Sequence, residues 1–111
     1  MVKKVPDQGD VVWLTLDPAL GHEQKGRRPV LILTKKEYND VTDCHVVCPI
    51  TTKKKGYATE VLCSIEGKNS VILSDQIRNL DFRHRKAEYI ATIAQETLSE
   101  VQSKISTLLF K

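Results

Sequence analysis

The sequence predicts a mainly β protein, in which a small antiparallel barrel is followed by one C-terminal helix. Between residues 11 and 73, short runs rich in branched apolar residues alternate with turn-sized polar segments. This pattern is typical of consecutive antiparallel strands, and small sheets of this kind tend to curl into barrels. Beyond residue 94 the apolar period becomes helical. We therefore expect a helix that covers one opening or one face of the sheet.

The expected strands are short and bounded by turn-forming residues. Val30 to Leu33 is continuously apolar, which predicts a strand buried on both faces. A short helical turn is expected at residues 35–39, and a hairpin turn at Glu66-Gly67-Lys68-Asn69. Residues 75–78 are expected to continue or kink the strand before them. The expected strands span residues 11–16, 30–33, 45–50, 60–65, 70–73 and 89–93.

The expected helix covers about four turns near the C-terminus. It begins either near Ala94 or at Thr97, whose spacing to Glu100 fits a capping box. A single apolar stripe is predicted to face the sheet, and it consists of Leu98, Val101, Ile105, Leu108 and Leu109.

Length and composition limit the class of protein. The 111 residues, with 41% hydrophobic and 28% charged side chains, predict a single globular domain over residues 1–111. No apolar run is long enough for a membrane span, and the polar N-terminus does not resemble a signal peptide. A cytoplasmic location without membrane association is therefore expected. The three cysteines include no CxxC pair, which favours reduced thiols over a disulfide framework or a zinc site.

Positive charge is clustered, although the net charge is only +3. One cluster contains Lys25, Arg27 and Arg28, a second is the run Lys53 to Lys55, and a third lies at residues 83–86. If these clusters converge in the fold, they form a surface for a polyanion such as nucleic acid. The alternative is three solvated loops.

The segment from Gly21 to Pro29 carries the strongest candidates for chemistry. Arg28 can hold a phosphate through two parallel hydrogen bonds and stabilise negative charge. His22 or Glu23 can move a proton. Pro29 restricts Arg28 to an extended backbone at the entrance of a strand. These are components for phosphodiester cleavage, and a solubilising loop is the alternative interpretation.

Two further segments carry candidate contacts to RNA. Thr51 leaves the end of a strand, and the lysines after it can follow a phosphate backbone. Tyr57 can stack on a base, whereas Asp75 and Gln76 can bind a base edge or a loop backbone. The candidate RNA-binding residues are Lys25, Arg27, Thr52, Lys53, Lys54, Lys55, Tyr57, Asp75, Gln76 and Arg78.

The sequence contains no P-loop, GxSxG, HExxH or clustered carboxylates. A nuclease of this composition is therefore expected to work without a metal or cofactor. It would use the ribose 2′-hydroxyl as its nucleophile, so RNA is the expected substrate.

Five short motifs occur in order along the chain: Gly9-Asp10-Val11-Val12-Trp13, Asp17-Pro18, Gly21-His22-Glu23-Gln24-x-Gly26-x-Arg28-Pro29-Val30, Pro49-Ile50-Thr51 and Asp75-Gln76-Ile77-Arg78. Together, and with their gaps, they resemble the MazF/PemK (Kid) family of toxin–antitoxin endoribonucleases. The resemblance runs from about Pro6 to the end of the expected helix. Tyr38-Asn39 and Lys55-Gly56-Tyr57 are similar to MazF-like members in particular.

The resemblance implies an SH3-like, partly open β-barrel with a C-terminal helix, assembled as a homodimer. It implies sequence-specific, metal-independent cleavage of single-stranded mRNA, leaving 2′,3′-cyclic phosphate and 5′-hydroxyl ends and inhibiting translation and growth. It also implies a MazE-like antitoxin whose acidic, disordered C-terminal segment covers the RNA site. DNA would be contacted only through the antitoxin complex.

The resemblance also implies roles for individual residues. Arg28 and Thr51 correspond to the catalytic pair of MazF-like members. Arg28 would stabilise the phosphate and pass a proton to the leaving 5′-oxygen, while Thr51 would orient the phosphate or the 2′-hydroxyl. Glu23 and His22 would support the reaction or carry a proton.

Some PemK-like members instead use a His, Arg and Asp set. His22 and Asp75 match that set, but Leu73 stands where its arginine would be. This departure favours Arg28 with Thr51 as the catalytic pair.

Two other functions remain open on the sequence. One is a CcdB-like toxin, which shares the fold and poisons DNA gyrase by binding, and which should depend on residues of the C-terminal helix. Arg28 and Thr51 in their motifs argue against it. The other is an RNA-binding barrel without activity.

Overall fold

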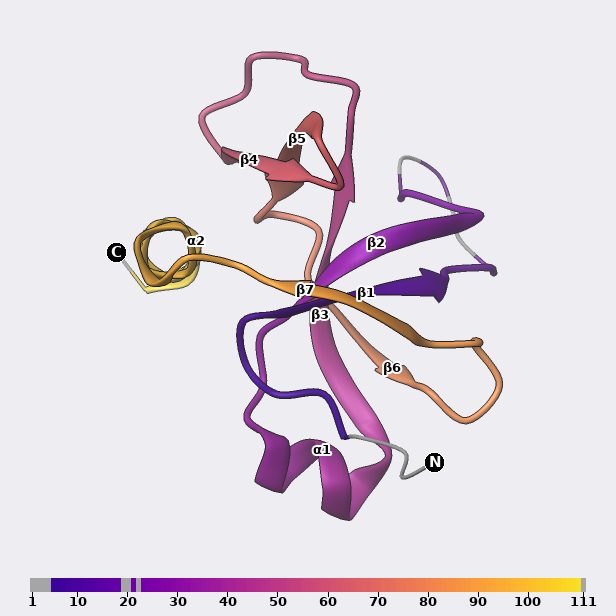
Figure 1. Cartoon of the computed structure of the whole chain (residues 1–111). Helices are drawn as coiled ribbons and strands as arrows, with labels where there is room; N and C mark the ends of the chain where they lie inside the picture. The colour runs from indigo at the N-terminus through magenta and orange to yellow at the C-terminus, as the bar shows by residue number, and fades with distance from the viewer. Residues whose placement is uncertain (1–4, 19–20, 22, 111) are drawn as a thin grey trace.

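The computed structural model describes residues 5–18, 21 and 23–110. In this part of the chain a seven-stranded antiparallel sheet curls into a partly open barrel with two helices at its margins (Figure 1). The predicted fold class is confirmed. The elements are β1 (Asp10–Thr15), β2 (Arg27–Ile32), α1 (Lys36–Thr42), β3 (Cys44–Thr51), β4 (Glu60–Ile65), β5 (Lys68–Leu73), β6 (Arg78–Asp81), β7 (Glu88–Thr92) and α2 (Gln95–Leu109).

Strand β3 connects the two parts of the sheet. The strands follow the order β4-β5-β3-β2-β1-β7, and β6 pairs with β3 outside this path. The first half of β3 pairs with β6, its middle pairs with β2, and its last two residues, Ile50 and Thr51, pair with β5. β3 pairs with three different strands along its length, and the β4–β5 hairpin therefore turns away from the other strands (Figure 1).

Both faces of the sheet are covered by apolar side chains. One cluster lies between the main strands, the β4–β5 hairpin and α2, and includes Val11, Leu31, Cys48, Ile72 and Val101. The cluster on the opposite face contains Val12, Leu14, Leu16, Val30, Ile32, Val47 and Leu80. Val30, Leu31 and Ile32 of the predicted apolar strand are therefore buried on both sides, as the sequence predicts. The strand itself, however, begins earlier, at Arg27, and ends before Leu33, which is only half-buried.

Three elements differ from the sequence-based expectation. α1 is a full helix over Lys36–Thr42, longer than the expected turn at residues 35–39. Residues 75–78 do not continue the fifth strand, because a turn follows Leu73, whose carbonyl accepts a hydrogen bond from the Gln76 amide at 3.1 Å. A further strand, β6, begins at Arg78 and was not predicted. It is four residues long, and only Leu80 is buried in it, so it lacks an apolar pattern.

Helix α2 begins after Ala94, which confirms the earlier of the two expected starts. Leu98 and Val101 are buried against the sheet, and Ile105 packs at its edge. Leu108 and Leu109, however, are 51% and 58% exposed, so the prediction of one continuous buried stripe is wrong for the last turn. Neither helix in the described residues is long and apolar enough to cross a membrane.

The β4–β5 hairpin has a two-residue turn, shorter than the predicted segment of residues 66–69. Ile65 pairs directly with Lys68, so Glu66 and Gly67 form the turn and Lys68 already belongs to β5. Both turn residues have positive φ, 51° and 78°. This is the geometry of a type I′ turn, whose twist matches that of the flanking strands.

A buried amide ties three segments together, and its removal is expected to destabilise the fold. Asn39 is 1% exposed; its Nδ2 donates to the carbonyls of Pro6 and Thr34, and its Oδ1 accepts from the Thr34 hydroxyl. Asn39→Ala should lower the free energy of unfolding by about 2–3 kcal/mol, because buried polar groups lose their partners. Urea denaturation measures this. Asn79→Ala, at an exposed asparagine, should cost less than about 0.5 kcal/mol, and equal losses would contradict the assignment.

His45 predicts a loss of stability in mild acid. Its buried ring stacks on Phe82 with centroids 3.7 Å apart, and neither ring nitrogen makes a hydrogen bond of normal geometry in the described chain. Burial lowers the pKa of His45 to about 4, although the nearby Asp43 carboxylate acts in the opposite direction.

Because the unfolded imidazole binds its proton near pH 6.5, the unfolded state gains protons first as the pH falls. Stability should therefore decrease from about pH 6.5 to about pH 4, by up to about 3 kcal/mol in total. Unfolding curves across this range measure the effect. His45→Phe should flatten the dependence, whereas His84→Gln, at an exposed position, should leave it in place. A dependence that persists in His45→Phe would assign it to other groups.

Candidate active site

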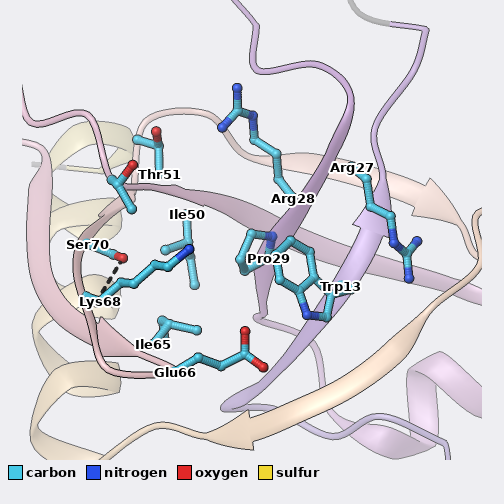
Figure 2. A pocket seen from close by; sticks show the side chains of 11 residues that line it. Trp13, Arg27, Arg28, Pro29, Ile50, Thr51, Ile65, Glu66, Lys68 and Ser70 are labelled. Atoms are coloured by element: carbon cyan, nitrogen blue, oxygen red, sulfur yellow. Dashed lines mark hydrogen bonds between the residues drawn. The ribbon is translucent and has the colours of Figure 1, made fainter.

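A cavity of about 240 Å³ opens where β1 and β2, the end of β3 and the β4–β5 hairpin meet (Figure 2). Residues of β1 and β2, of the end of β3 and of the β4–β5 hairpin line it, so the site depends on the curl of the sheet. The lining residues are Trp13, Arg27, Arg28, Pro29, Ile50, Thr51, Thr52, Ile65, Glu66, Lys68 and Ser70. Four predicted site residues are among them: Arg27, Arg28, Thr51 and Thr52.

Arg28 is held by the strand that carries it. It pairs with Leu14 across β1 and β2, next to Pro29, which pairs with Trp13. Its Nε donates to the carbonyl of Lys25 at 3.1 Å. In the described part of the chain no carboxylate forms an ion pair with its guanidinium, so the terminal nitrogens can bind an anion.

Thr51 lies at the same end of the cavity as Arg28 (Figure 2). It is the last residue of β3, pairs with Val71 of β5 and is only 5% exposed. Its Oγ1 accepts a hydrogen bond from the Lys53 amide at 3.2 Å. The hydroxyl proton therefore remains available for a ligand, and the rigid strand end fixes the direction of the oxygen.

The loop before Arg28 is anchored by side chains from elsewhere. The Gln24 amide donates to Gln76 Oε1 at 3.0 Å, and the Gly26 amide donates to Asp17 Oδ1 at 3.1 Å. Gln76 thus binds a loop backbone, which is one of its two predicted roles. Glu23 is exposed in this loop and is not among the residues that line the cavity. His22 lies outside the described residues.

The lysine run continues from the cavity as an exposed loop. Lys53, Lys54, Lys55 and Tyr57 are all exposed between β3 and β4. The carboxylate of Glu60 holds this loop by accepting from the amides of Lys55 and Gly56, at 3.0 and 3.1 Å. The side chains can therefore extend the positive charge that begins at Arg28, although they do not line the cavity itself.

Other predicted contacts are engaged within the fold. Arg78 donates to the carbonyls of Leu16 and Pro18, both at 3.1 Å. Arg27 forms an ion pair with Glu88 at 3.2 Å, and its side chain points away from Arg28 (Figure 2). Because Arg78 binds backbone carbonyls and Arg27 binds Glu88, each guanidinium has fewer N–H donors left for RNA than the sequence suggests.

The third basic cluster is also used structurally. Arg85 donates to the carbonyls of Thr15 and Asp17, both at 3.0 Å, and Arg83 pairs with Asp81. The Arg83 guanidinium lowers the pKa of the Asp81 carboxyl to about 2. No residue of this cluster lines the cavity, so only the first two clusters flank it.

The described residues favour neither a metal site nor a cysteine nucleophile. Among the described residues no three His, Cys, Asp or Glu side chains converge as metal ligands would. Burial, with a smaller contribution from Asp75, raises the pKa of the Cys48 thiol to about 12, and burial raises that of Cys63 to about 11. Both thiols are therefore protonated at neutral pH and poor nucleophiles. Asp75 itself is exposed and lies outside the cavity lining.

Sequence reasoning missed the hairpin side of the cavity, and it missed Trp13, which pairs with Pro29 beside Arg28. Trp13, Glu66, Lys68 and Ser70 line the cavity but were not predicted as site residues. The local sequence of the hairpin indicates a turn, and only the pairing of β5 with the end of β3 brings this turn beside Arg28. The available signal was the pair of opposite charges flanking Gly67.

Comparisons with known proteins agree with this architecture. The family model described as PemK-like, MazF-like toxin of type II toxin–antitoxin system matches residues 7–109. Endoribonuclease toxin MazF of Escherichia coli K12 is 39% identical over 105 residues, which is 95% of each chain. Endoribonuclease PemK of Escherichia coli is 33% identical and covers 93% of this chain and 81% of its own.

Solved structures give the same result. MazF from Deinococcus radiodurans superimposes with a TM-score of 0.92 at 44% identity, covering 98% of this chain and 100% of that one. A MazE–MazF complex from the same organism contains a chain with a TM-score of 0.84 at 44% identity, covering 96% and 97%. With the family model matched over nearly the whole length and relatives above 30% identity, this chain belongs to the PemK-like, MazF-like toxin family of type II toxin–antitoxin systems.

Proposed function

We propose that this protein is the toxin of a type II toxin–antitoxin system and a sequence-specific endoribonuclease that cleaves single-stranded RNA without a metal. The observation that carries the proposal is the cavity in which Arg28 and Thr51, from two different strands, lie at one end. The names of the relatives, MazF, PemK and, in Bacillus subtilis, EndoA, support ribonuclease activity.

In the proposed reaction the 2′-hydroxyl of one nucleotide attacks the adjoining phosphate. The O2′–P bond forms and the P–O5′ bond breaks, which leaves a 2′,3′-cyclic phosphate and a 5′-hydroxyl. Negative charge builds on the non-bridging oxygens, where the free nitrogens of Arg28 can stabilise it through bidentate hydrogen bonds. Arg28 also donates a proton to the leaving O5′, and the Thr51 hydroxyl orients the phosphate or the 2′-hydroxyl.

The remaining residues of the proposal have supporting roles. The 2′-hydroxyl must lose its proton, and Glu23 or His22, in the loop that leads to Arg28, would accept it. Phosphates on either side of the cut would contact the lysines at residues 53–55, with further contacts from the other RNA-binding residues predicted above. Because the loop containing Glu23 is anchored through Gln24, it can hold a carboxylate near the cavity.

We further propose a MazE-like antitoxin as the partner, with an acidic, disordered C-terminal segment that covers the RNA site. The exposed lysine loop favours such a segment electrostatically, and structures of MazE–MazF complexes exist for similar chains. A homodimer, a cytoplasmic location and DNA contact only through the antitoxin complex belong to the same proposal. Inhibition of translation and growth would follow from cleavage of mRNA.

Gyrase poisoning, as by CcdB, is not favoured. The family model is that of PemK-like and MazF-like toxins, and the relatives above 30% identity are named endoribonucleases. The same names disfavour an RNA-binding barrel without activity.

The function is tested by incubating the purified protein with a mixture of single-stranded RNAs in EDTA and mapping the ends of the products. We expect discrete cuts with cyclic phosphate ends, because a 2′-hydroxyl nucleophile needs no metal ion. Addition of magnesium after EDTA removal should not raise the rate. Intact RNA across many sequences would overturn the proposal and direct the search to a protein target.

The role of Arg28 is tested with Arg28→Ala and Arg28→Lys. Cleavage should fall by at least about 100-fold in both, since lysine keeps the charge but not the paired donors. RNA binding should fall by less than about tenfold, because the lysine loop remains. Lys36→Ala removes one positive charge from α1, at the opposite end of the molecule from the hairpin (Figure 1), and should cleave normally. Full activity in Arg28→Ala would show that the catalytic assignment is wrong.

A further inference from the structure

Two opposite charges at the tip of the β4–β5 hairpin line the cavity, and among the described residues neither forms an ion pair. Glu66 and Lys68 flank Gly67, and both side chains line the cavity (Figure 2). The ion pairs of the described chain are Arg27 with Glu88 and Arg83 with Asp81, so Glu66 and Lys68 do not pair with each other. Both charged groups are therefore available to a ligand that enters the cavity.

The backbone at Glu66 is unfavourable for glutamate. Its φ of 51° lies in the left-handed region, which long side chains rarely occupy. A type I′ turn prefers Asn-Gly at these two positions, and the chain has Glu-Gly. Energetically poor backbone positions are often retained where the side chain has a function.

The cavity offers a place for a nucleobase beside this carboxylate. Trp13 and Pro29 form the wall next to Glu66, whose carboxylate lies toward the indole in Figure 2, and aromatic side chains are platforms for unpaired bases. Sites for drug-sized ligands measure about 300–1,000 Å³. At about 240 Å³ the cavity is slightly smaller than these sites, so it has room for one nucleotide and not for a longer segment. Arg28 and Thr51 at the other end would hold its phosphate.

The chemistry of a carboxylate limits which base is accepted. An ionised carboxylate only accepts hydrogen bonds, so it favours a base edge that donates. Adenine, cytosine and guanine each carry an exocyclic amino group. Uracil offers only its N3–H on the pairing edge, and the two carbonyl oxygens on either side of that donor carry partial negative charge that repels a carboxylate. Lys68 carries donors only, which suits a phosphate oxygen.

We propose that Glu66 is a specificity-determining residue of the RNA site, which accepts a hydrogen bond from the exocyclic amino group of a base next to the scissile phosphate, while Lys68 binds a neighbouring phosphate. This inference rests on the proposed ribonuclease function. It assigns discrimination to the hairpin and bond cleavage to the strand ends.

The test compares cut sites in a randomised single-stranded RNA library for the wild type, Glu66→Gln and Glu66→Asn. In the wild type, one position near the cut should exclude uracil. In both variants, uracil should become accepted there, with discrimination reduced by about tenfold or more, while preferences at other positions stay. Glu66→Asn should also raise the melting temperature, because Asn suits the turn. A gain in stability with a loss of discrimination excludes misfolding as the cause.

Glu96→Gln is the matched control, since it removes the same charge from the exposed first turn of α2. Its cut sites should equal those of the wild type. Lys68→Ala should retain the cut-site pattern and lower the salt dependence of RNA binding by about one phosphate contact.

Three results would overturn the inference. An unchanged cut-site profile in Glu66→Gln and Glu66→Asn would remove Glu66 from recognition. An equal loss of rate at all sequences would assign Glu66 to the chemistry. An unchanged salt slope in Lys68→Ala would remove Lys68 from the phosphate backbone. If the wild type cleaves no RNA at all, the proposed function itself fails, which is a different outcome from any of these.

Discussion

The site depends on the way β3 shares its backbone hydrogen bonds. Within eight residues this strand pairs with β6, β2 and β5 in turn, and from Val47 to Thr51 every residue is buried. A strand in this position cannot shift its register by one residue, because the shift would place the side chains of each core cluster on the opposite face of the sheet. Thr51 is thereby fixed by the sheet as a whole, and so is the position of the hairpin that forms the opposite wall.

Much of the fold could be predicted because its strands carry their own signal. β2 contains the apolar run from Val30 to Ile32, β3 is mostly apolar from Val46 to Ile50, and α2 has a clear helical period in Leu98, Val101 and Ile105. β6 was missed since only Leu80 of its four residues is buried and apolar, and so short a strand leaves little trace in composition. The end of α2 was misjudged for the opposite reason: a period shows which face is apolar, but not how far the partner surface extends.

The residues of the candidate site were predictable only where the sequence immediately around each residue carries a signal. Arg28 directly precedes Pro29 near the start of β2, and Thr51 ends β3 two residues after Pro49, so each has a local pattern in the sequence. Glu66 and Lys68 enter the site through the long-range pairing of β5 with β3. Charge alone was also ambiguous, because a guanidinium can face solvent or bind carbonyls. Arg78 and Arg85 bind the carbonyls of residues 15–18 and so secure the segment that leads to the loop before Arg28.

The two-residue turn of the hairpin has a consequence for how such a protein diversifies. Glu66 is exposed at the tip of the hairpin, so a change of its side chain leaves the packing of the core in place. Arg28 and Thr51, by contrast, are embedded in strands whose neighbours belong to the core. With the roles proposed for Glu66, Arg28 and Thr51, descendants of one ancestral gene would change which transcripts they attack through substitutions at Glu66, while the residues proposed to break the phosphodiester bond are inherited unchanged.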